Sequence, residues 1–481
     1  MPPFTPLFIA GKKVPASDGN TFEVKNPFSN QVVGICASAS SADCSNAILA
    51  AGEAFKTWEH SPINDRRDII LRAAQLMKSD KYKTQVVEAV AEETAAVPSM
   101  ALFNWIGATA LLQDSPALVN ELHGLNFPSG KVKGGSVVVE RRAMGFRNIP
   151  LECPGEFDSQ SNSDPILCGN TVVFRSSEMS PRSQSVVFEL LEEAGLPAGV
   201  FNCISTSRET APELTAQIIA HPLVRKINFT GSDRVGRAIA IEAAKHLKPC
   251  VLELGGKAPV VVLDDANIHE AAKAIIHAAL MHSGQICMST ERVIVQRGAF
   301  EKLRDQLCEL VRTLKAGDAH TDSSFKLGAL FTESSAQNVQ SMIQEAKDAG
   351  ANVLVGDLAR NGAVIQPHIV TDVKPGMRLW DRESFGPVIV LVAADSVDEA
   401  VDLANDSDYS LSAGLWTSNL YLAKDVSSRI HSGYVNINGS TIHSESNYGL
   451  IGLGGSSGYG RFHVQDFTDL RVVVTHPLPT V

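Results

Sequence analysis

The stretch Gly284-Gln285-Ile286-Cys287-Met288-Ser289-Thr290 places a single cysteine between an alanine-rich amphipathic run and the strand-like sequence Arg292-Val293-Ile294-Val295. The glycine three residues before the thiol lets the backbone approach closely, because it has no Cβ. A junction between a helix and a strand also suits a partly exposed nucleophile. Taken alone, however, a cysteine is more often a small buried apolar side chain. Both interpretations of Cys287 stay open on this stretch.

A second stretch, Glu253-Leu254-Gly255-Gly256-Lys257, precedes the β-branched block Val260-Val261-Val262, which is typical of a buried parallel strand. Two glycines beside a carboxylate predict a tight acidic corner, and a solvated loop acid is the alternative for Glu253. Cys287 follows this glutamate by 34 residues. The two stretches together resemble the general-base and nucleophile motifs of the aldehyde dehydrogenase superfamily. The resemblance implies that Cys287 is the nucleophile and Glu253 the general base.

Composition limits the remaining classes. The 481 residues, 44% hydrophobic and 20% charged, predict an ordinary globular protein of two or three domains. The excess of acidic residues gives a net charge of −11, which disfavours nucleic acid and anionic membrane surfaces as partners. No apolar run is long enough for a membrane span, and no leader pattern begins the sequence. Eight cysteines without zinc-type spacing predict no metal site, a reducing compartment and a cytoplasmic location.

The fold class predicted is α/β. From Asn170 to Ser232 strands alternate with helices, which favours βαβ units and a parallel sheet, and a similar alternation extends from residue 267 to about 400. The resemblance covers nearly the whole chain and implies an aldehyde dehydrogenase-like architecture. We expect a Rossmann-type NAD-binding domain in residues 1–118 and 142–253, an α/β catalytic domain in residues 254–447, and β oligomerisation elements in residues 119–141 and 464–481.

Local patterns add detail at the ends of the chain. Residues 7–35 predict a β-arm, and the first helices are expected to begin with Ser41 as N-cap and with Pro62 at the first helical position. The segment from Phe127 to Glu140 predicts a hairpin, and Leu470 to Thr475 an isolated strand. The resemblance implies that these strands form a sheet across the subunits of a homodimer or homotetramer. Pairing within one chain is the alternative.

A cofactor site is expected where Ile227 to Ser232 leads into a helix, because a glycine turn at a helix start offers free N–H groups and the positive end of the helix dipole to a phosphate. Without a G-x-G-x-x-G pattern this signal is weak. The resemblance implies that Glu383 binds the nicotinamide ribose, where a turn acid is the alternative, and that Phe385 also binds the cofactor. It also assigns a further set of residues to the cofactor: Arg175, Glu178, Phe229, Thr230, Gly231, Ser232, Leu254 and Gly255.

The cofactor is expected to be NAD rather than NADP. Arg175 stands where the family has a lysine, and Glu178 stands where its glutamate contacts the adenine ribose. A carboxylate at this position accepts hydrogen bonds from the ribose hydroxyls and repels a 2′-phosphate. Without the resemblance, Arg175 and Glu178 would be interpreted as an ion pair at the end of a strand.

The sequence departs from the family at three places. Pro150-Leu151-Glu152 stands in the register of a Pro-Trp-Asn element, so Glu152 replaces the asparagine that donates to the oxyanion. The polar segment from Gly155 to Asp164 replaces a largely apolar helix and predicts a loop or an altered cavity wall. The segment from Leu450 to Gly455 replaces a Pro-Phe-Gly-Gly-Val-Lys pattern.

The function expected is NAD-dependent oxidation of an aldehyde through a thiohemiacetal and a thioester on Cys287. The run from Gln285 to Arg292 is most similar to the salicylaldehyde and vanillin dehydrogenase-like branch, which implies aromatic aldehydes. Two alternatives remain. One is a cofactor-independent thiol esterase or acyl transferase. The other is a catalytically impaired binding protein that keeps only the fold, because Glu152 replaces the oxyanion donor.

Overall fold

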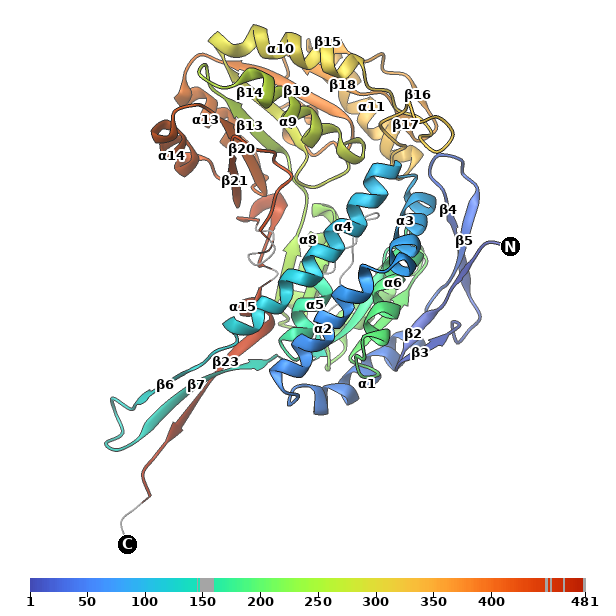
Figure 1. The fold of residues 1–481 in the computed structure, drawn as a ribbon, viewed down its shortest axis with the longest axis vertical. Coiled ribbons are helices and arrows are strands. Elements are labelled where there is room, and N and C mark those ends of the chain that lie inside the picture. Colours follow the sequence, from blue (N-terminus) through green and yellow to red (C-terminus); the bar gives the residue numbers. More distant parts are fainter. Residues whose placement is uncertain (145, 148–159, 446–448, 450–451, 462, 479–481) are drawn as a thin grey trace.

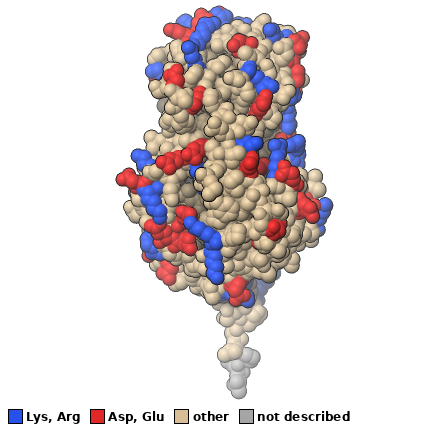
Figure 2. All heavy atoms as spheres, turned by 90° about the vertical axis from the view of Figure 1, so that its right-hand side faces the viewer, with Lys and Arg blue, Asp and Glu red and all other residues tan. Residues whose placement is uncertain are grey.

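The computed structural model describes residues 1–144, 146–147, 160–445, 449, 452–461 and 463–478. Figure 1 shows two α/β bodies, one above the other, with a long β-ribbon that leaves the lower body and carries the C-terminus at its tip. The lower body contains the N-terminal half of the chain and the upper body most of the rest. On the face drawn in Figure 2, acidic and basic side chains are interspersed, without a continuous basic surface.

The lower body contains short sheets with strand orders β1-β5-β4, β3-β2-β10-β9-β8 and β11-β12-β22. The strands β8, β9 and β10 are parallel, and so are β11 and β12, as the alternating pattern predicts. The strand bounds are β1 Phe4–Thr5, β2 Leu7–Ile9, β3 Lys12–Val14, β4 Thr21–Lys25, β5 Val32–Ala37, β8 Phe146–Arg147, β9 Thr171–Ser176, β10 Phe201–Ser205, β11 Ile227–Thr230, β12 Cys250–Glu253 and β22 Gly458–Tyr459.

Helices cover these sheets, and their bounds are α1 Ser41–Trp58, α2 Ile63–Met77, α3 Asp80–Thr94, α4 Pro98–Asp114, η1 Ser115–Glu121, α5 Gln160–Leu167, α6 Pro181–Glu193, α7 Ala211–Ala220, α8 Asp233–Lys245 and α15 Val464–Phe467. Two predicted starts were wrong by one residue. The N-cap of α1 is Ser40, because its side chain accepts from the Asp43 N–H while Asp43 accepts from the Ser40 N–H, a capping box. Pro62 precedes α2 as its N-cap, with ψ 138°.

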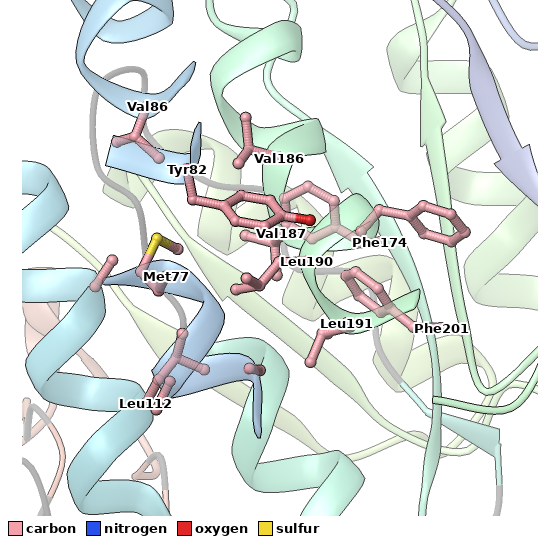
Figure 3. Close-up of a cluster of buried hydrophobic side chains, with 14 of the residues drawn as sticks. Met77, Tyr82, Val86, Leu112, Phe174, Val186, Val187, Leu190, Leu191 and Phe201 are labelled. Atoms are coloured by element: carbon pink, nitrogen blue, oxygen red, sulfur yellow. The ribbon is translucent and has the colours of Figure 1, made fainter. Parts of the chain in front are cut away.

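The core of the lower body is aromatic and aliphatic. Phe8 and Phe188 lie 4.1 Å apart between ring centroids, and Phe174 and Phe201 lie 6.0 Å apart. Figure 3 shows how Tyr82 and other apolar side chains from α2, α3 and α4 meet those of α6, β9 and β10. This packing fixes β9, whose C-terminal end carries the predicted cofactor residues, against the helical layer.

The upper body contains a seven-stranded sheet of order β15-β18-β19-β14-β13-β20-β21, parallel except for β15. Its strands are β13 Ala258–Val262, β14 Thr290–Gln296, β15 Asn352–Val355, β18 His368–Thr371, β19 Val388–Ala394, β20 Ser412–Trp416 and β21 Tyr434–Ile437. A small ribbon pairs β16 Arg360–Asn361 with β17 Val364–Ile365. The helices and the turn before β14 are α9 Ile268–Leu280, η2 Met281–Gly284, α10 Arg297–Arg312, α11 Glu333–Asp348, α12 Arg378–Asp381, α13 Val397–Asn405, α14 Leu420–Arg429 and η3 Gly455–Ser457.

Helices cover both faces of this sheet. Along β13, Val260 and Val262 pack in one buried cluster with α9 and α10, whereas Val261 packs in another with α11, α13 and α14. Successive strand side chains point to opposite faces, so a strand buried on both sides reads as a continuous β-branched run. The prediction of a buried parallel strand after Lys257 is therefore confirmed.

The ribbon in Figure 1 is a three-stranded antiparallel sheet of order β23-β7-β6. Its strands are β6 Leu125–Pro128, β7 Ser136–Ala143 and β23 Thr468–Thr475. The hairpin prediction is confirmed, and the C-terminal strand pairs with β7 of the same chain. Leu470, Val472 and Val474 on β23 are 60, 60 and 43% exposed. The pairing observed within the described chain is thus intramolecular, and the second edge of β23 has no partner strand there.

One prediction for the polar segment from Gly155 to Asp164 needs correction. Residues from Gln160 onward form α5 and are not a loop, while the residues before it lie outside the described part of the chain. Ser163 and Asp164 are buried although they are polar. After α5, the Asn170 amide donates to the carbonyls of Pro165 and Phe467 and fixes the exit of the chain into β9. Tertiary burial therefore determines the helix where apolar periodicity is absent.

Candidate active site

Three of the predicted site residues, Glu253, Cys287 and Glu383, lie where the two bodies meet. Glu253 ends β12, and only four residues separate it from the start of β13. Cys287 lies between the η2 turn and β14, and Glu383 lies five residues before β19. The carboxyl ends of β11 and β12 therefore face the amino ends of β13, β14 and β19. The candidate active site lies between these two edges.

The two predicted catalytic side chains are in contact. The Cys287 thiol donates to Oε1 of Glu253 across 3.6 Å, and Glu253 is 5% exposed, whereas Cys287 is partly exposed. A Cβ on Gly256 would lie 2.0 Å from the carbonyl oxygen of Cys287, so only glycine permits this approach. A carboxylate at hydrogen-bond distance from a thiol can take its proton, which is the arrangement that nucleophilic catalysis requires.

The turn before the thiol has an unusual backbone. His282, Ser283 and Gly284 have φ values of 49°, 58° and 77°, all in the left-handed region. A Cβ on Gly284 would lie 2.2 Å from the Gly386 carbonyl, so the predicted close approach at this glycine is confirmed. The Gln285 amide then fixes the turn: its Oε1 accepts from the Phe331 N–H at 2.8 Å, and its Nε2 donates to the His282 carbonyl at 3.0 Å.

His282 was not predicted from the sequence. Its ring is buried 5.2 Å from that of Phe331, and burial lowers its pKa to about 4, so the imidazole is neutral at pH 7. Phe331 in turn stacks on Phe385 at 6.3 Å. No spacing in the sequence relates these three rings, which come from separate loops. The row of three rings, His282, Phe331 and Phe385, packs the turn before Cys287 onto the turn that carries Glu383.

Glu383 is held beside the acidic corner. Its Oε1 accepts from the Gly256 N–H at 2.9 Å, and a Cβ on Gly255 would lie 2.4 Å from its Oε2. Burial, together with the nearby charge of Glu291, raises the pKa of Glu383 to about 8. The glycine pair therefore leaves room for the half-buried Glu383 carboxylate, and the predicted residues Leu254, Gly255, Glu383 and Phe385 lie in adjoining segments.

The glycine turn before α8 lies next to Glu253. The Gly231 N–H donates to the Glu253 carbonyl at 3.0 Å, and Ser232 caps α8 by accepting from the Val235 N–H. Thr230 pairs with Glu253 in register at the ends of β11 and β12. Phe229 is buried, and its ring lies 2.6 Å from where a Cβ on Gly231 would be. The structure thus places Gly231 and Ser232 at the surface of the turn and Phe229 beneath it.

An ion pair connects this turn to the segment of Glu383. Asp233, the first residue of α8, accepts from Arg382 at 2.7 Å, and Arg382 precedes Glu383 in the chain. The Arg382 guanidinium also lies 5.7 Å from the ring centroid of Tyr409. Two predicted cofactor-binding segments from different bodies are therefore joined by adjacent charged side chains.

Arg175 is the penultimate residue of β9, and Glu178 follows the carboxyl end of this strand. Arg175 donates to Thr206 Oγ1 at 2.9 Å, and burial lowers its pKa to about 10 while Glu178 opposes that change. Among the described residues Arg175 therefore donates to a hydroxyl, and no ion pair joins it to Glu178. The ion-pair interpretation of these two residues is wrong as to the contact, although the charges still interact.

The structure describes only part of the segments in which the sequence departs from the family. Glu152 lies outside the described residues. Of the replaced segment from Leu450 to Gly455, Gly452 to Gly455 is described and leads into Ser457, which secures the acidic corner: Ser457 Oγ donates to the Gly255 carbonyl at 2.8 Å and its carbonyl accepts from the Leu254 N–H at 3.2 Å. Ser457, which follows the altered segment, therefore supports the loop after Glu253 directly.

Two further observations concern the whole described chain. Within these residues no helix has both the length and the apolar character of a membrane span. The same residues contain no cluster of three or more His, Cys, Asp or Glu side chains that could hold a metal ion.

The fold and the pairing of thiol and carboxylate agree with comparisons to known proteins. The chain belongs to the aldehyde dehydrogenase family, whose profile matches residues 14–473, and this family comprises nicotinamide-dependent oxidoreductases that act on aldehydes. Vanillin dehydrogenase of a Pseudomonas species is 39% identical over 472 residues, which are 97% of this chain and 96% of that protein. A crystal structure of salicylaldehyde dehydrogenase from Pseudomonas putida complexed with salicylaldehyde has a TM-score of 0.95 and 35% identity, and covers 100% of this chain and 99% of its own.

Cofactor names differ among the relatives. A succinate-semialdehyde dehydrogenase (NADP(+)) of Deinococcus radiodurans is 32% identical over 475 residues, which are 95% of each protein. The family and fold predicted from the sequence are confirmed by these comparisons. The choice between NAD and NADP stays a prediction.

Proposed function

We propose that this protein oxidises an aromatic aldehyde to the carboxylic acid with NAD. The observation that carries the proposal is the 3.6 Å contact between the Cys287 thiol and the Glu253 carboxylate, placed between a helix N-terminus and the half-buried Glu383. The relatives named for vanillin and salicylaldehyde support an aromatic substrate. Cys287 also packs against a buried apolar cluster that includes Ile286 and Met288, which suits an aryl group.

The residues around the site fit a nicotinamide dinucleotide. The capped N-terminus of α8 suits a pyrophosphate. The Glu383 carboxylate, which lies beside Gly255, suits the hydroxyl groups of a ribose. Arg175 and Glu178 would lie at the adenine ribose, where Glu178 favours NAD by repelling a 2′-phosphate. The bound cofactor supplies the acceptor for the hydride that leaves the substrate carbon.

The chain's own residues carry the remaining chemistry. Glu253 takes the proton of the Cys287 thiol and passes it to solvent, and the thiolate adds to the aldehyde carbon to give a thiohemiacetal. Oxidation converts this adduct to a thioester on Cys287. Glu253 then removes a proton from water, which attacks the thioester carbonyl, and the carboxylic acid leaves as the thiol is restored. In the register of the family, Glu152 replaces the asparagine that donates to the oxyanion formed in the first step.

A direct assay tests this proposal. The purified protein is given NAD or NADP with vanillin, salicylaldehyde, benzaldehyde and an aliphatic aldehyde, and reduced cofactor is followed by absorbance. We expect turnover with the aromatic aldehydes and NAD. Hydrolysis of p-nitrophenyl acetate by a protein that produces no reduced cofactor from any of these aldehydes would instead support the thiol esterase, and an inert Cys287 would support a binding protein.

The cofactor preference has its own test. NAD should bind more tightly than NADP by calorimetry, and Glu178→Gln should reduce the difference by about threefold to tenfold because it removes the repelling charge. Glu192→Gln, a change of charge at another glutamate of the same body, serves as the control. An unchanged ratio in Glu178→Gln would exclude Glu178 as the selecting residue.

We also propose the assembly and the domain division expected from the sequence. Residues 1–118 and 142–253 would form the cofactor domain, residues 254–447 the catalytic domain, and residues 119–141 and 464–481 the oligomerisation elements. The unpartnered edge and exposed apolar side chains of β23 suit pairing with another subunit in a homodimer or homotetramer. Sedimentation of the intact protein measures this directly. The cysteine pattern supports a cytoplasmic location.

A further inference from the structure

A buried ion pair lies behind the candidate active site. Lys257 Nζ and Glu291 Oε2 are 2.5 Å apart, and their side chains are 0 and 4% exposed. Lys257 follows the glycine pair of the acidic corner, and Glu291 is the second residue of β14, four positions after Cys287. The chemistry described above uses neither residue.

The Glu291 carboxylate accepts hydrogen bonds from the two residues that follow Glu383. The Ser384 N–H lies 3.1 Å from Oε1 and 3.0 Å from Oε2, and the Ser384 hydroxyl donates to Oε2 at 2.7 Å. The Phe385 N–H donates to Oε1 at 3.4 Å. One carboxylate therefore holds two successive backbone N–H groups and a hydroxyl, while Lys257 supplies the opposite charge.

Stability alone is a poor reason for such a pair. Removing two charges from water is costly, and well-packed apolar side chains often serve a fold equally well. What the pair does in this structure is geometric. Phe385 has a φ of 50°, an unfavourable conformation for a residue with a Cβ, and it persists only where neighbouring contacts enforce it. Glu291 makes those contacts directly.

We propose that Glu291, oriented by Lys257, is a positioning residue that fixes the turn Glu383-Ser384-Phe385 in the conformation that receives the nicotinamide ribose. This inference rests on the proposed function, in which Glu383 contacts that ribose. The clamp joins three segments: the loop after Glu253, the strand after Cys287 and the turn of Glu383. It thereby holds the cofactor-binding carboxylate in register with the nucleophile.

The test variant is Glu291→Gln, which keeps the side-chain size. The glutamine oxygen can still accept from one N–H, but its amide nitrogen cannot accept from Ser384 Oγ, and Lys257 loses its counter-charge. We expect the Kd for NAD, measured by calorimetry, to rise about tenfold or more. The rate at which iodoacetamide alkylates Cys287, and cofactor-free hydrolysis of p-nitrophenyl acetate, should change less than about twofold.

Two further variants separate positioning from folding. Lys257→Met combined with Glu291→Met removes both charges at similar volume, so the protein should fold and still lose affinity for NAD. Asp265→Asn is the matched control. Its carboxylate accepts from Thr417 Oγ1 and from the Ser418 and Asn419 N–H groups, the same pattern, after the carboxyl end of β13 and so at the opposite edge of the sheet. It should leave the affinity for NAD unchanged.

The outcomes are distinct. If the unaltered protein binds neither NAD nor NADP, the proposed function fails and the inference fails with it. If the unaltered protein binds NAD and Glu291→Gln binds it equally well, only the inference is overturned. Loss of thiol reactivity together with NAD affinity in both Glu291 variants would also overturn it, because the pair would then maintain the fold of the whole site.

Discussion

The two sheet edges that form the site differ in how they carry their functional groups. At the carboxyl ends of β11 and β12, Ser232 is exposed at a capped helix N-terminus, a ready-made position for an anion. At the amino ends of β13, β14 and β19, the Glu291 side chain is buried and Glu383 is half-buried, and both carboxylates are held by hydrogen bonds from neighbouring loops. Ligands of open α/β sheets bind at carboxyl ends. The second edge, which lies next to Cys287 and is called the chemical edge, therefore needs hydrogen bonds from neighbouring loops to hold its functional groups in place.

The largest expected effect separates the two edges completely. Cys287→Ala removes the nucleophile at the chemical edge, so aldehyde oxidation should fall below detection while calorimetric NAD binding and the melting temperature stay close to those of the unaltered protein. Cys308→Ala is the control, because Cys308 is also a cysteine but is buried in α10. Undiminished oxidation by Cys287→Ala would disprove the assignment of the nucleophile.

Glu253 lies on the other edge, and its loss should affect one step more than another. Glu253→Gln should slow hydrolysis of the thioester on Cys287 by about 10²-fold or more, whereas the first turnover should still produce a burst of NADH. Rapid mixing with the aldehyde measures both phases. If the burst disappears while iodoacetamide still alkylates Cys287 normally, the step that depends most on Glu253 precedes formation of the thioester instead of following it.

The charge of Glu152 is expected to determine how fast the thiolate adds to the aldehyde. An ionised carboxylate at the oxyanion position would repel both the thiolate and the oxyanion, where a donor is typically worth about 10²–10³ in rate. We expect Glu152→Asn to raise NADH formation about tenfold or more near pH 7, measured as initial rates. A drop in rate, or an unaltered protein that is fast and weakens only as pH rises, would indicate that Glu152 donates as a protonated acid.

The comparison also shows which features the sequence predicts. Continuous β-branched runs predict the buried strands, and the motifs around Glu253 and Cys287 place both residues at strand ends, where the structure brings them together. The contact of Glu291 with Ser384 joins residues 93 positions apart. Local periodicity carries no information on such a contact, so the clamp, like the row from His282 to Phe385, required the fold.

The wrong predictions for the N-cap of α1 and for the helix α5 also come from contacts that local propensity does not reveal. Ser40 and Ser41 are both good N-caps by composition, and the choice depends on Asp43, which returns a hydrogen bond to the Ser40 N–H. The start of α5 is helical because the polar residues Ser163 and Asp164 are buried by neighbouring elements. Propensity is a weak indicator where tertiary contacts dominate.

The smallest expected effect is on the pH dependence of stability, through the carboxyl group of Glu383. Burial raises the pKa of Glu383 from 4.5 to about 8, with Glu291 and Asp233 acting in the same direction and Lys257 and the Gly256 N–H opposing them. Between these two pH values the folded protein holds a proton that the unfolded chain has released. The contribution to stability is therefore complete below about pH 4.5 and is lost as pH rises through about 8.

Glu383→Gln removes this titration because the amide stays neutral. Its melting temperature without cofactor should equal that of the unaltered protein at low pH and exceed it by roughly 2 °C or more at pH 9, since the unaltered protein must then bury a carboxylate. The buried Glu93, whose pKa rises to about 7, weakens the fold over the same range but is present in both proteins, so it cancels from the difference. Differential scanning calorimetry at pH 5 and pH 9 gives the comparison. A difference that is the same at both pH values would mean that Glu383 does not titrate in this window and that its carboxylate is ionised throughout.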